Sequence, residues 1–472
     1  MRIRRRRFML LALAAVATIS VCLSASASAD LDYRIDLDVD WDAGTFAGTL
    51  DLTFANPGDA PIDRVALNLF ANDATLYGAA SLRVLDAAIG ETPLPLPVQT
   101  EPTWLALPLP AALSPGQTAT LVLRFVGEAA PSPATASAAR SGYGILTKNA
   151  DSFVLTAFYP ILAVDGAPVA PSCGIGDRLW GDAADYTVTL RTSPGLSVAS
   201  TGTLQSSSRD VDRATHVLHA ESARDFSLVL LDDYELAELQ SGSRTLLAHF
   251  TPFDREAAAR ALEIGFEAFD LYESRVGDLP YREVEIVEVP LQRVAGVEFT
   301  GLILVSETYA QNPYSTFFDI IVSHEMAHQW FYATVGNDPY DAPWLDESMA
   351  TFFSNVYLAA HRSSTSALSE RARWVQSYGA AQRGAQELSV GDSSCAFPSS
   401  STYSAFVYDG GALFLQTVRN EIGDDAFFGA LASYYSSHLA KIASADALLA
   451  AFESACACDL DEVFREFGFR EE

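Results

Sequence analysis

The segment Ser323-His324-Glu325-Met326-Ala327-His328-Gln329-Trp330 decides how the rest of the chain is interpreted. On a helix, His324 and His328 lie four residues apart on one face, so their rings can share one metal ion. Neutral imidazole nitrogens suit zinc, and Glu325 lies beside them, where a carboxylate can take a proton from zinc-bound water. This segment therefore predicts a helix that carries a catalytic zinc site.

The sequence after this helix supplies a third candidate ligand. Gly336-Asn337-Asp338-Pro339 is a strong helix stop, and Pro343 stands at the start of a second helix that contains Glu347. Two antiparallel helices joined by a tight turn would return Glu347 to the histidines and leave one zinc position open for water. The alternative is an ordinary amphipathic helix with two packed histidines, which the position of Glu347 argues against.

The spacing resembles that of a known family. His324-Glu325-x-x-His328, then 18 residues, then Glu347, is similar to the gluzincin metallopeptidases, specifically the aminopeptidase N family. Ala295-Gly296-Val297-Glu298-Phe299 resembles the Gly-x-Met-Glu-Asn strand motif of that family. The resemblance implies that Gly296 and Glu298 bind substrate, with Glu298 on the free α-amine. Val297 and Phe299 depart from the Met and Asn of the motif.

Two more positions follow from the same resemblance. Tyr408, before Asp-Gly-Gly-Ala, is similar to the family's catalytic tyrosine, which donates to the oxyanion of the tetrahedral intermediate. Tyr403 is the alternative if the alignment is shifted. Ala157 stands where the family has a glutamine in the pocket for the first substrate side chain. Ala157 is therefore a substrate-binding position that lacks one polar contact.

The apolar pattern divides the chain into two domains. Apolar residues alternate from Tyr33 onward and strand signals continue to Leu231, whereas helical periodicity dominates after residue 241, with Asp254 expected as the first helix cap. This predicts an α+β protein in which an N-terminal β-sandwich or saddle domain, 30–240, precedes a thermolysin-like, mostly helical catalytic domain, 241–472. Gly301–Val305 is expected as an edge strand that pairs with an extended peptide. Pro131–Gly142 is expected as a mobile loop.

The first 29 residues predict export. Five arginines precede an apolar run, and Ala27-Ser28-Ala29 forms a signal-peptide cleavage site. Arg5-Arg6-Arg7-Phe8-Met9 also resembles a twin-arginine signal, with the general secretory route as the alternative. The mature protein is expected to be extracellular or periplasmic. No later apolar run approaches about 18 residues, so no stable membrane span is expected.

Charge and cysteine content limit the partners. The net charge of −30 repels phosphate, which excludes nucleic acid as a partner. Four cysteines follow the cleavage site, and an even number permits disulfides in an oxidising compartment. Cys173 with Cys395 is a candidate pair, while the connectivity of Cys456 and Cys458 stays open.

These observations together predict a secreted zinc aminopeptidase with one Zn²⁺ per chain. Its substrates would be peptides with a free N-terminus. A thermolysin-like endopeptidase and a non-catalytic zinc-binding peptide-groove protein are the alternatives. The sequence does not determine the oligomeric state.

Overall fold

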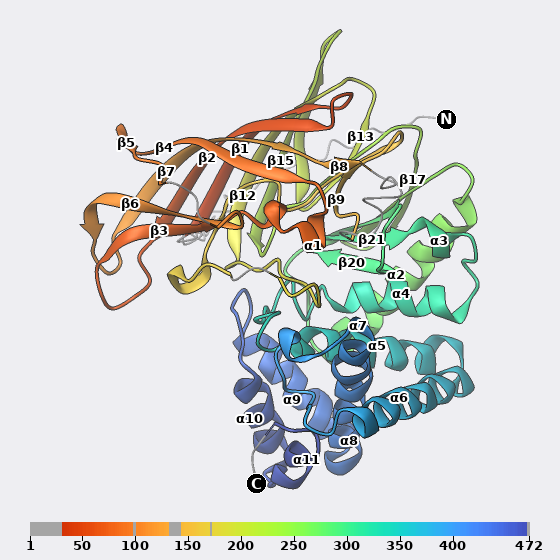
Figure 1. Cartoon of the computed structure of the whole chain (residues 1–472). Helices are drawn as coiled ribbons and strands as arrows, with labels where there is room; N and C mark the ends of the chain where they lie inside the picture. Colours follow the sequence, from red (N-terminus) through yellow and green to blue (C-terminus); the bar gives the residue numbers. More distant parts are fainter. Residues whose placement is uncertain (1–30, 98–100, 132–142, 170–171, 470–472) are drawn as a thin grey trace, which may run out of the picture.

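A computed structural model describes residues 31–97, 101–131, 143–169 and 172–469. A β-rich half precedes a helical half, as predicted for the α+β class (Figure 1). The predicted signal peptide and residues 132–142 of the predicted loop lie outside the described residues. Within the described part of the chain, no helix is long and apolar enough to cross a bilayer.

The N-terminal half contains three sheets. The largest has the order β14-β15-β12-β1-β2-β7-β4-β5. Its strands alternate buried and exposed residues, with Tyr33, Ile35 and Leu37 of β1 in the core, because one face of the sheet meets solvent. The strands are β1 Leu31–Asp40, β2 Thr45–Ala55, β4 Ser81–Ile89, β5 Thr92–Leu94, β7 Thr118–Glu128, β12 Ala184–Thr192, β14 Thr203–Arg209 and β15 Ala214–Ala223.

Two smaller sheets and a short helix complete this half. The sheet orders are β13-β16-β10-β9-β8 and β11-β3-β6. Their elements are β3 Ile62–Asn68, β6 Trp104–Leu113, β8 Ala130–Pro131, β9 Leu146–Lys148, β10 Ser152–Leu155, β11 Ile161–Leu162, β13 Ser197–Ser200, β16 Leu228–Leu231 and the helix α1 Ala74–Tyr77.

A fourth sheet carries the candidate site. Its order is β17-β18-β19-β21-β20, with β17 Glu235–Ser241, β18 Arg244–Phe250, β19 Glu283–Val289, β20 Gly296–Phe299 and β21 Leu302–Ser306. The prediction of an edge strand at Gly301–Val305 is wrong: β21 lies between β19 and β20, because a tight turn folds β20 back along it. The strand at this edge of the sheet is β20. The predicted domain boundary at residue 240 falls within β17 and stays a prediction.

This sheet lies between two hydrophobic cores. Ile286 and Ile303 pack in the core of the helical half, whereas Val287 and Leu304 pack in the core of the β-rich half. A strand buried on both faces needs a continuous apolar sequence, which explains the run Leu302–Val305. The sheet is therefore held from both sides.

Helices form the rest of the chain. They are α2 Arg255–Arg275, α3 Glu307–Ala310, α4 Thr316–Ala327, α5 Trp344–Tyr357, α6 Ser364–Gly384, α7 Ser400–Tyr403, α8 Gly411–Ile422, α9 Asp424–Ser437, α10 Ala445–Cys456 and α11 Asp461–Glu466. Asp254 precedes α2 but makes no side-chain cap, since its carboxylate instead accepts a hydrogen bond from the Thr251 hydroxyl at 3.1 Å.

Disulfides join the four described cysteines. The predicted pair Cys173–Cys395 is confirmed, with Cα atoms 5.7 Å apart and a sequence separation of 222. Cys456 and Cys458, whose connectivity was open, are also bonded to each other. The first bridge ties a loop of the β-rich half to the helical half.

Candidate metal and peptide site

The three predicted ligands converge where α4 meets α5. α4 ends at Ala327, so His324 lies in its last turn and His328 is its C-cap. The Nε2 atoms of the two histidines lie 3.1 Å apart. Oε2 of Glu347, in the first turn of α5, lies 3.2 Å from His324 Nε2 and 3.5 Å from His328 Nε2. One carboxylate oxygen and two imidazole nitrogens thus face a common point.

This donor set fits zinc. Ligand atoms about 2.0–2.1 Å from a tetrahedral zinc ion lie about 3.3 Å from one another, close to the separations found here. The Nδ1 atom of His328 lies 3.1 Å from the carbonyl oxygen of Phe331, to which it can donate, so Nε2 keeps its lone pair for a metal. Burial raises the pKa of Glu347, but hydrogen bonds from His324 and His328 outweigh burial and lower it. An ionised carboxylate is the form that binds a metal.

Glu325 lies beside this donor set with one oxygen free. Its side chain is 5 % exposed, and Oε2 has no hydrogen-bond partner among the described residues. Burial, followed by the charge of Glu298, raises its pKa well above the usual range. Gly296 makes room for this carboxylate, since a Cβ atom at residue 296 would lie 2.6 Å from Cδ of Glu325. Gly296 therefore adjoins Glu325, and its predicted contact with substrate stays a prediction.

Glu298 is presented by the edge strand β20, which lies against α4 (Figure 1). Its side chain is 8 % exposed, and burial raises its pKa to about 8. A buried carboxylate of this kind favours a cationic partner. The predicted contact of Glu298 with an α-amine stays a prediction. The strand edge open to pairing with a peptide is that of β20, and not that of Gly301–Val305 as predicted.

Two buried polar residues near the site were not predicted. The side chain of Gln329 accepts hydrogen bonds from Gly301 N at 2.9 Å and Tyr281 Oη at 2.7 Å, and donates to Phe299 O at 3.1 Å. Gln329 thereby fixes the C-terminal end of α4 to the β20–β21 turn. Asp346 is 5 % exposed and accepts a bond from the backbone N–H of Glu347 at 2.8 Å. Gln329 directly follows His328 and Asp346 directly precedes Glu347. This adjacency to predicted ligands is the sequence signal that could have identified both residues.

Tyr408 lies in a π-helical turn, Ser404–Gly410, before α8. Its hydroxyl donates to Oε1 of Glu347, and its ring stacks on that of His324 with centroids 5.9 Å apart. Tyr403 lies behind it, with ring centroids also 5.9 Å apart. Tyr408 is thus the tyrosine that contacts Glu347, and its predicted catalytic role stays a prediction.

Ala157 lies in the core of the β-rich half. Its side chain is 1 % exposed, and its φ of 49° places it in the left-handed region. Few alanines adopt this conformation. The methyl group offers no polar contact, so the predicted role in substrate binding stays a prediction.

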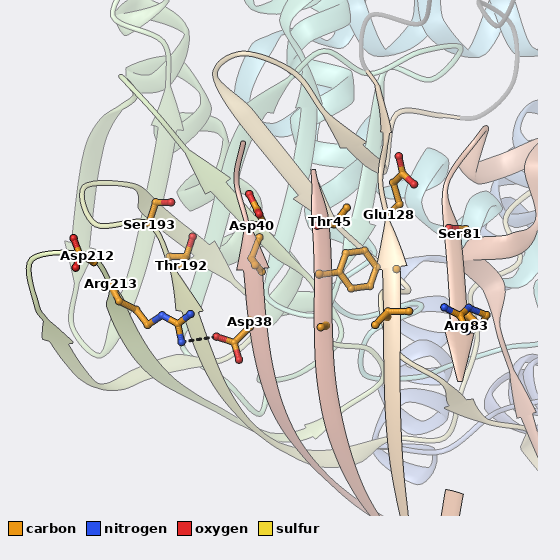
Figure 2. Close-up of a pocket in the computed structure, with 15 residues that line it drawn as sticks. Asp38, Asp40, Thr45, Ser81, Arg83, Glu128, Thr192, Ser193, Asp212 and Arg213 are labelled. Carbon is orange, nitrogen blue, oxygen red and sulfur yellow. Dashed lines mark ion pairs between the residues drawn. The ribbon is translucent and has the colours of Figure 1, made fainter. Parts of the chain in front are cut away.

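A separate hollow lies on the large sheet and carries no comparable chemistry. It measures about 630 Å³ and is lined by residues of β1, β2, β4 and β7, by Thr192 at the end of β12, and by loop residues near β12 and β15 (Figure 2). Arg213 and Asp38 form an ion pair of 2.7 Å at its rim. The described residues that line it include no histidine or cysteine. The two histidines and the glutamate that could hold a metal ion lie instead where α4 meets α5.

Comparison with known sequences gives a family match. Residues 260–467 match the model of the peptidase family M1 domain. "Probable aminopeptidase 1" of Saccharolobus solfataricus is 27 % identical over 182 residues, which are 36 % of this chain and 23 % of that protein. "Aminopeptidase N" of Lactobacillus delbrueckii subsp. lactis is 27 % identical over 217 residues, which are 43 % of this chain and 25 % of that protein. The matched segments span about a quarter of these relatives.

Solved structures share the fold over nearly the whole chain. An M1 zinc metallopeptidase from Deinococcus radiodurans superposes with a TM-score of 0.65 and 20 % sequence identity, covering 94 % of this chain and 96 % of that one. A variant of the same metallopeptidase, solved with a bound Tyr-Ser-Ala substrate, gives a TM-score of 0.66 at 20 % identity, covering 94 % of this chain and 95 % of that one.

Proposed function

Residues 260–467 form a peptidase family M1 domain of the aminopeptidase N family, and from this premise we propose that the chain is a zinc-dependent aminopeptidase. The observation that carries the proposal is the convergence of His324, His328 and Glu347 beside an edge strand that presents Glu298. The two histidines with Glu347 suit a metal ion, and Glu298 suits an ammonium group. A substrate whose α-ammonium group lies at Glu298 would have its first peptide bond near the metal ion.

The chemistry divides between the metal and the chain. His324, His328 and Glu347 would hold zinc, which would supply Lewis acidity for the activation of water and the polarisation of the scissile carbonyl. Glu325 takes a proton from the attacking water through its free Oε2 and later delivers that proton to the nitrogen of the leaving amine. The new C–O bond forms first, and the peptide C–N bond then breaks as its nitrogen is protonated, so one water is consumed and two products result.

Two further residues orient the substrate. Tyr408 exchanges its bond to Glu347 for one to the substrate oxygen as negative charge develops there. Glu298 holds the α-ammonium group, and β20 pairs with the first residues of the peptide. Together these contacts place the first peptide bond, and no later bond, beside Glu325.

The test compares a free aminoacyl amide with its N-acetylated form, with and without a chelator. An aminopeptidase cleaves only the free form, and the chelator abolishes cleavage. Equal cleavage of both forms would instead identify a thermolysin-like endopeptidase. Absence of cleavage by zinc-loaded protein would favour a peptide-groove protein.

We also propose that the protein is exported, on the basis of the signal-like residues 1–29. Expression in a bacterial host with residues 1–29 present should yield a mature chain that begins at Asp30 outside the cytoplasm. Recovery of the uncleaved chain in the cytoplasm would contradict export.

A further inference from the structure

Ser348 directly follows the candidate ligand Glu347 in α5, and the proposed chemistry gives it no role. Its side chain is fully buried, and its hydroxyl donates a hydrogen bond to the backbone carbonyl of Val407 at 2.8 Å. Val407 directly precedes Tyr408 in the π-helical turn Ser404–Gly410. This bond therefore joins the helix of the third candidate ligand to the turn that carries the tyrosine.

The bond acts on the peptide group that leads into Tyr408. The Val407 carbonyl and the Tyr408 Cα atom belong to one planar unit, so a bond that fixes the carbonyl also restrains the tyrosine backbone. On the other side of Tyr408, the carboxylate of Asp409 accepts hydrogen bonds from Arg373 at 2.9 and 3.2 Å. Both neighbours of Tyr408 are thus anchored, in a type of helical turn that is frequent at functional sites.

The contact between Ser348 and this turn depends on a close approach of two helices. Gly411 begins α8 directly after the turn, and a Cβ atom there would lie 1.7 Å from Oγ of Ser348. A side chain at residue 411 would therefore occupy the space of the serine hydroxyl. Because residue 411 is a glycine, α5 lies close enough for Ser348 to reach the Val407 carbonyl.

The position of the Tyr408 hydroxyl matters because this group has to serve two partners. It donates to Oε1 of Glu347 in the structure, and in the proposed reaction it passes to the substrate oxygen. A donor stabilises the developing charge only when it lies within hydrogen-bond distance of the place where that charge appears. A tyrosine on a turn that could shift would lose part of this effect.

We infer that Ser348 is a positioning residue: through the Val407 carbonyl it holds Tyr408 where the tyrosine hydroxyl can stabilise the oxyanion. The inference rests on the proposed peptidase function, and it applies equally to cleavage of a first or an internal peptide bond. In this role Ser348 acts only through Tyr408. The effect of Ser348 should therefore disappear when the Tyr408 hydroxyl is absent.

A double-mutant cycle tests this dependence. Ser348→Ala should lower kcat on a free aminoacyl amide about 10-fold with KM and zinc content unchanged, because a shifted tyrosine keeps only part of the effect of an oxyanion donor. In Tyr408→Phe protein the same change should lower kcat less than about 2-fold. A loss of about 10-fold in both backgrounds would show that Ser348 acts through Glu347 or the fold, and would overturn the inference.

Ser354→Ala is the matched control. Ser354 lies on the same helix, is 1 % exposed, and also donates from its hydroxyl to a backbone carbonyl at 2.8 Å, that of Thr351. Both changes remove a buried hydroxyl donor from α5, but only Ser348→Ala should lower kcat, and urea midpoints measure any loss of stability. An equal loss of kcat in both variants would reduce Ser348 to a structural role and overturn the inference.

A second variant serves if Ser348→Ala does not fold. Ser348→Cys keeps a side chain of similar shape with a weaker donor, so it should lower kcat about 3-fold with KM unchanged. This loss should again vanish in Tyr408→Phe protein. Wild-type kcat in the folded cysteine variant would overturn the inference.

Binding of a phosphinic dipeptide analogue separates this inference from the proposed function, because its tetrahedral phosphinyl group resembles the intermediate. Zinc-loaded Ser348→Ala protein should bind the analogue about 10-fold more weakly than wild-type protein, and Tyr408→Phe should remove this difference. If wild-type protein hydrolyses no peptide, the proposed function fails and this comparison alone decides the inference. Equal affinities of the wild-type and Ser348→Ala proteins for the analogue would overturn it.

Discussion

Glu325 and Gly296 occupy adjoining space although they lie 29 positions apart in the chain. The sequence pattern identified Glu325 as a base and Gly296 as a substrate contact, but it contained no sign that one depends on the other. The carboxylate of Glu325 passes so close to the backbone of residue 296 that any side chain there would displace it. Because residue 296 is a glycine and has no Cβ atom, the Glu325 carboxylate can occupy this position.

Glu325→Gln should leave zinc binding intact and remove nearly all turnover. The amide keeps the size of the side chain but cannot take a proton, and general-base catalysis contributes about 10²–10⁴-fold. The measurements are zinc content and kcat on a free aminoacyl amide. A variant that keeps half of the wild-type activity would end the assignment of Glu325 as the base.

Gly296→Ala should lower kcat by about 10- to 100-fold with little change in zinc content. The added Cβ atom pushes the Glu325 carboxylate aside, and a displacement of about 1 Å in a catalytic group can cost 10²-fold. Gly429→Ala is the control, because a Cβ atom at residue 429, in α9, meets nothing within 4 Å. Full activity in Gly296→Ala would show that Glu325 acts from another position.

At the scale of elements, strand patterns predicted where strands form but not which strand ends a sheet. Leu302–Val305 is apolar throughout, as a strand buried on both faces requires, whereas β20 is a four-residue strand with only one neighbour. Edge position depends on pairing, which the sequence of a single strand does not encode. The position of β20 depends on Gln329, whose amide joins α4 to the β20–β21 turn.

Gln329→Ala should destabilise the fold by about 2–4 kcal/mol. The change leaves the backbone N–H of Gly301 and the carbonyl of Phe299 without their partners in a buried place, at about 1–3 kcal/mol for each unsatisfied group. Urea unfolding followed by circular dichroism measures the loss. Gln240→Ala, at an exposed position on β17, should change stability by less than about 0.5 kcal/mol. Equal stability of both variants would refute the role of Gln329.

At the scale of the molecule, the order of β-rich and helical halves and the residues of the metal site could be predicted from the sequence. His324, His328 and Glu347 follow a fixed spacing, and helix geometry alone brings the two histidines together. The contact of Gly176 with Tyr403 could not be predicted, because the loop of Gly176 has neither helical nor strand periodicity. This contact depends on tertiary packing, and the bridge from Cys173 to Cys395 ties the same loop to the helical half.

Removal of the Cys173–Cys395 bridge by a double change to serine should lower stability by roughly 3–5 kcal/mol, because the bridge closes a very long loop. The double serine variant of Cys456 and Cys458, which close a loop of only a few residues, should lose about 1–2 kcal/mol. Unfolding midpoints under non-reducing conditions provide the comparison. A larger loss in the second variant would contradict this account.

Zinc should also stabilise the whole molecule. The buried carboxylates around His324 and His328 repel one another when no cation is bound, and zinc binds the folded chain better than the unfolded one. Chelation should therefore lower the Tm, since free zinc at about 100 times its Kd contributes about 2.7 kcal/mol to folding. In His328→Ala, which lacks one ligand, the chelator should change the Tm far less. An equal chelator effect on both proteins would place the stabilising ion elsewhere in the fold.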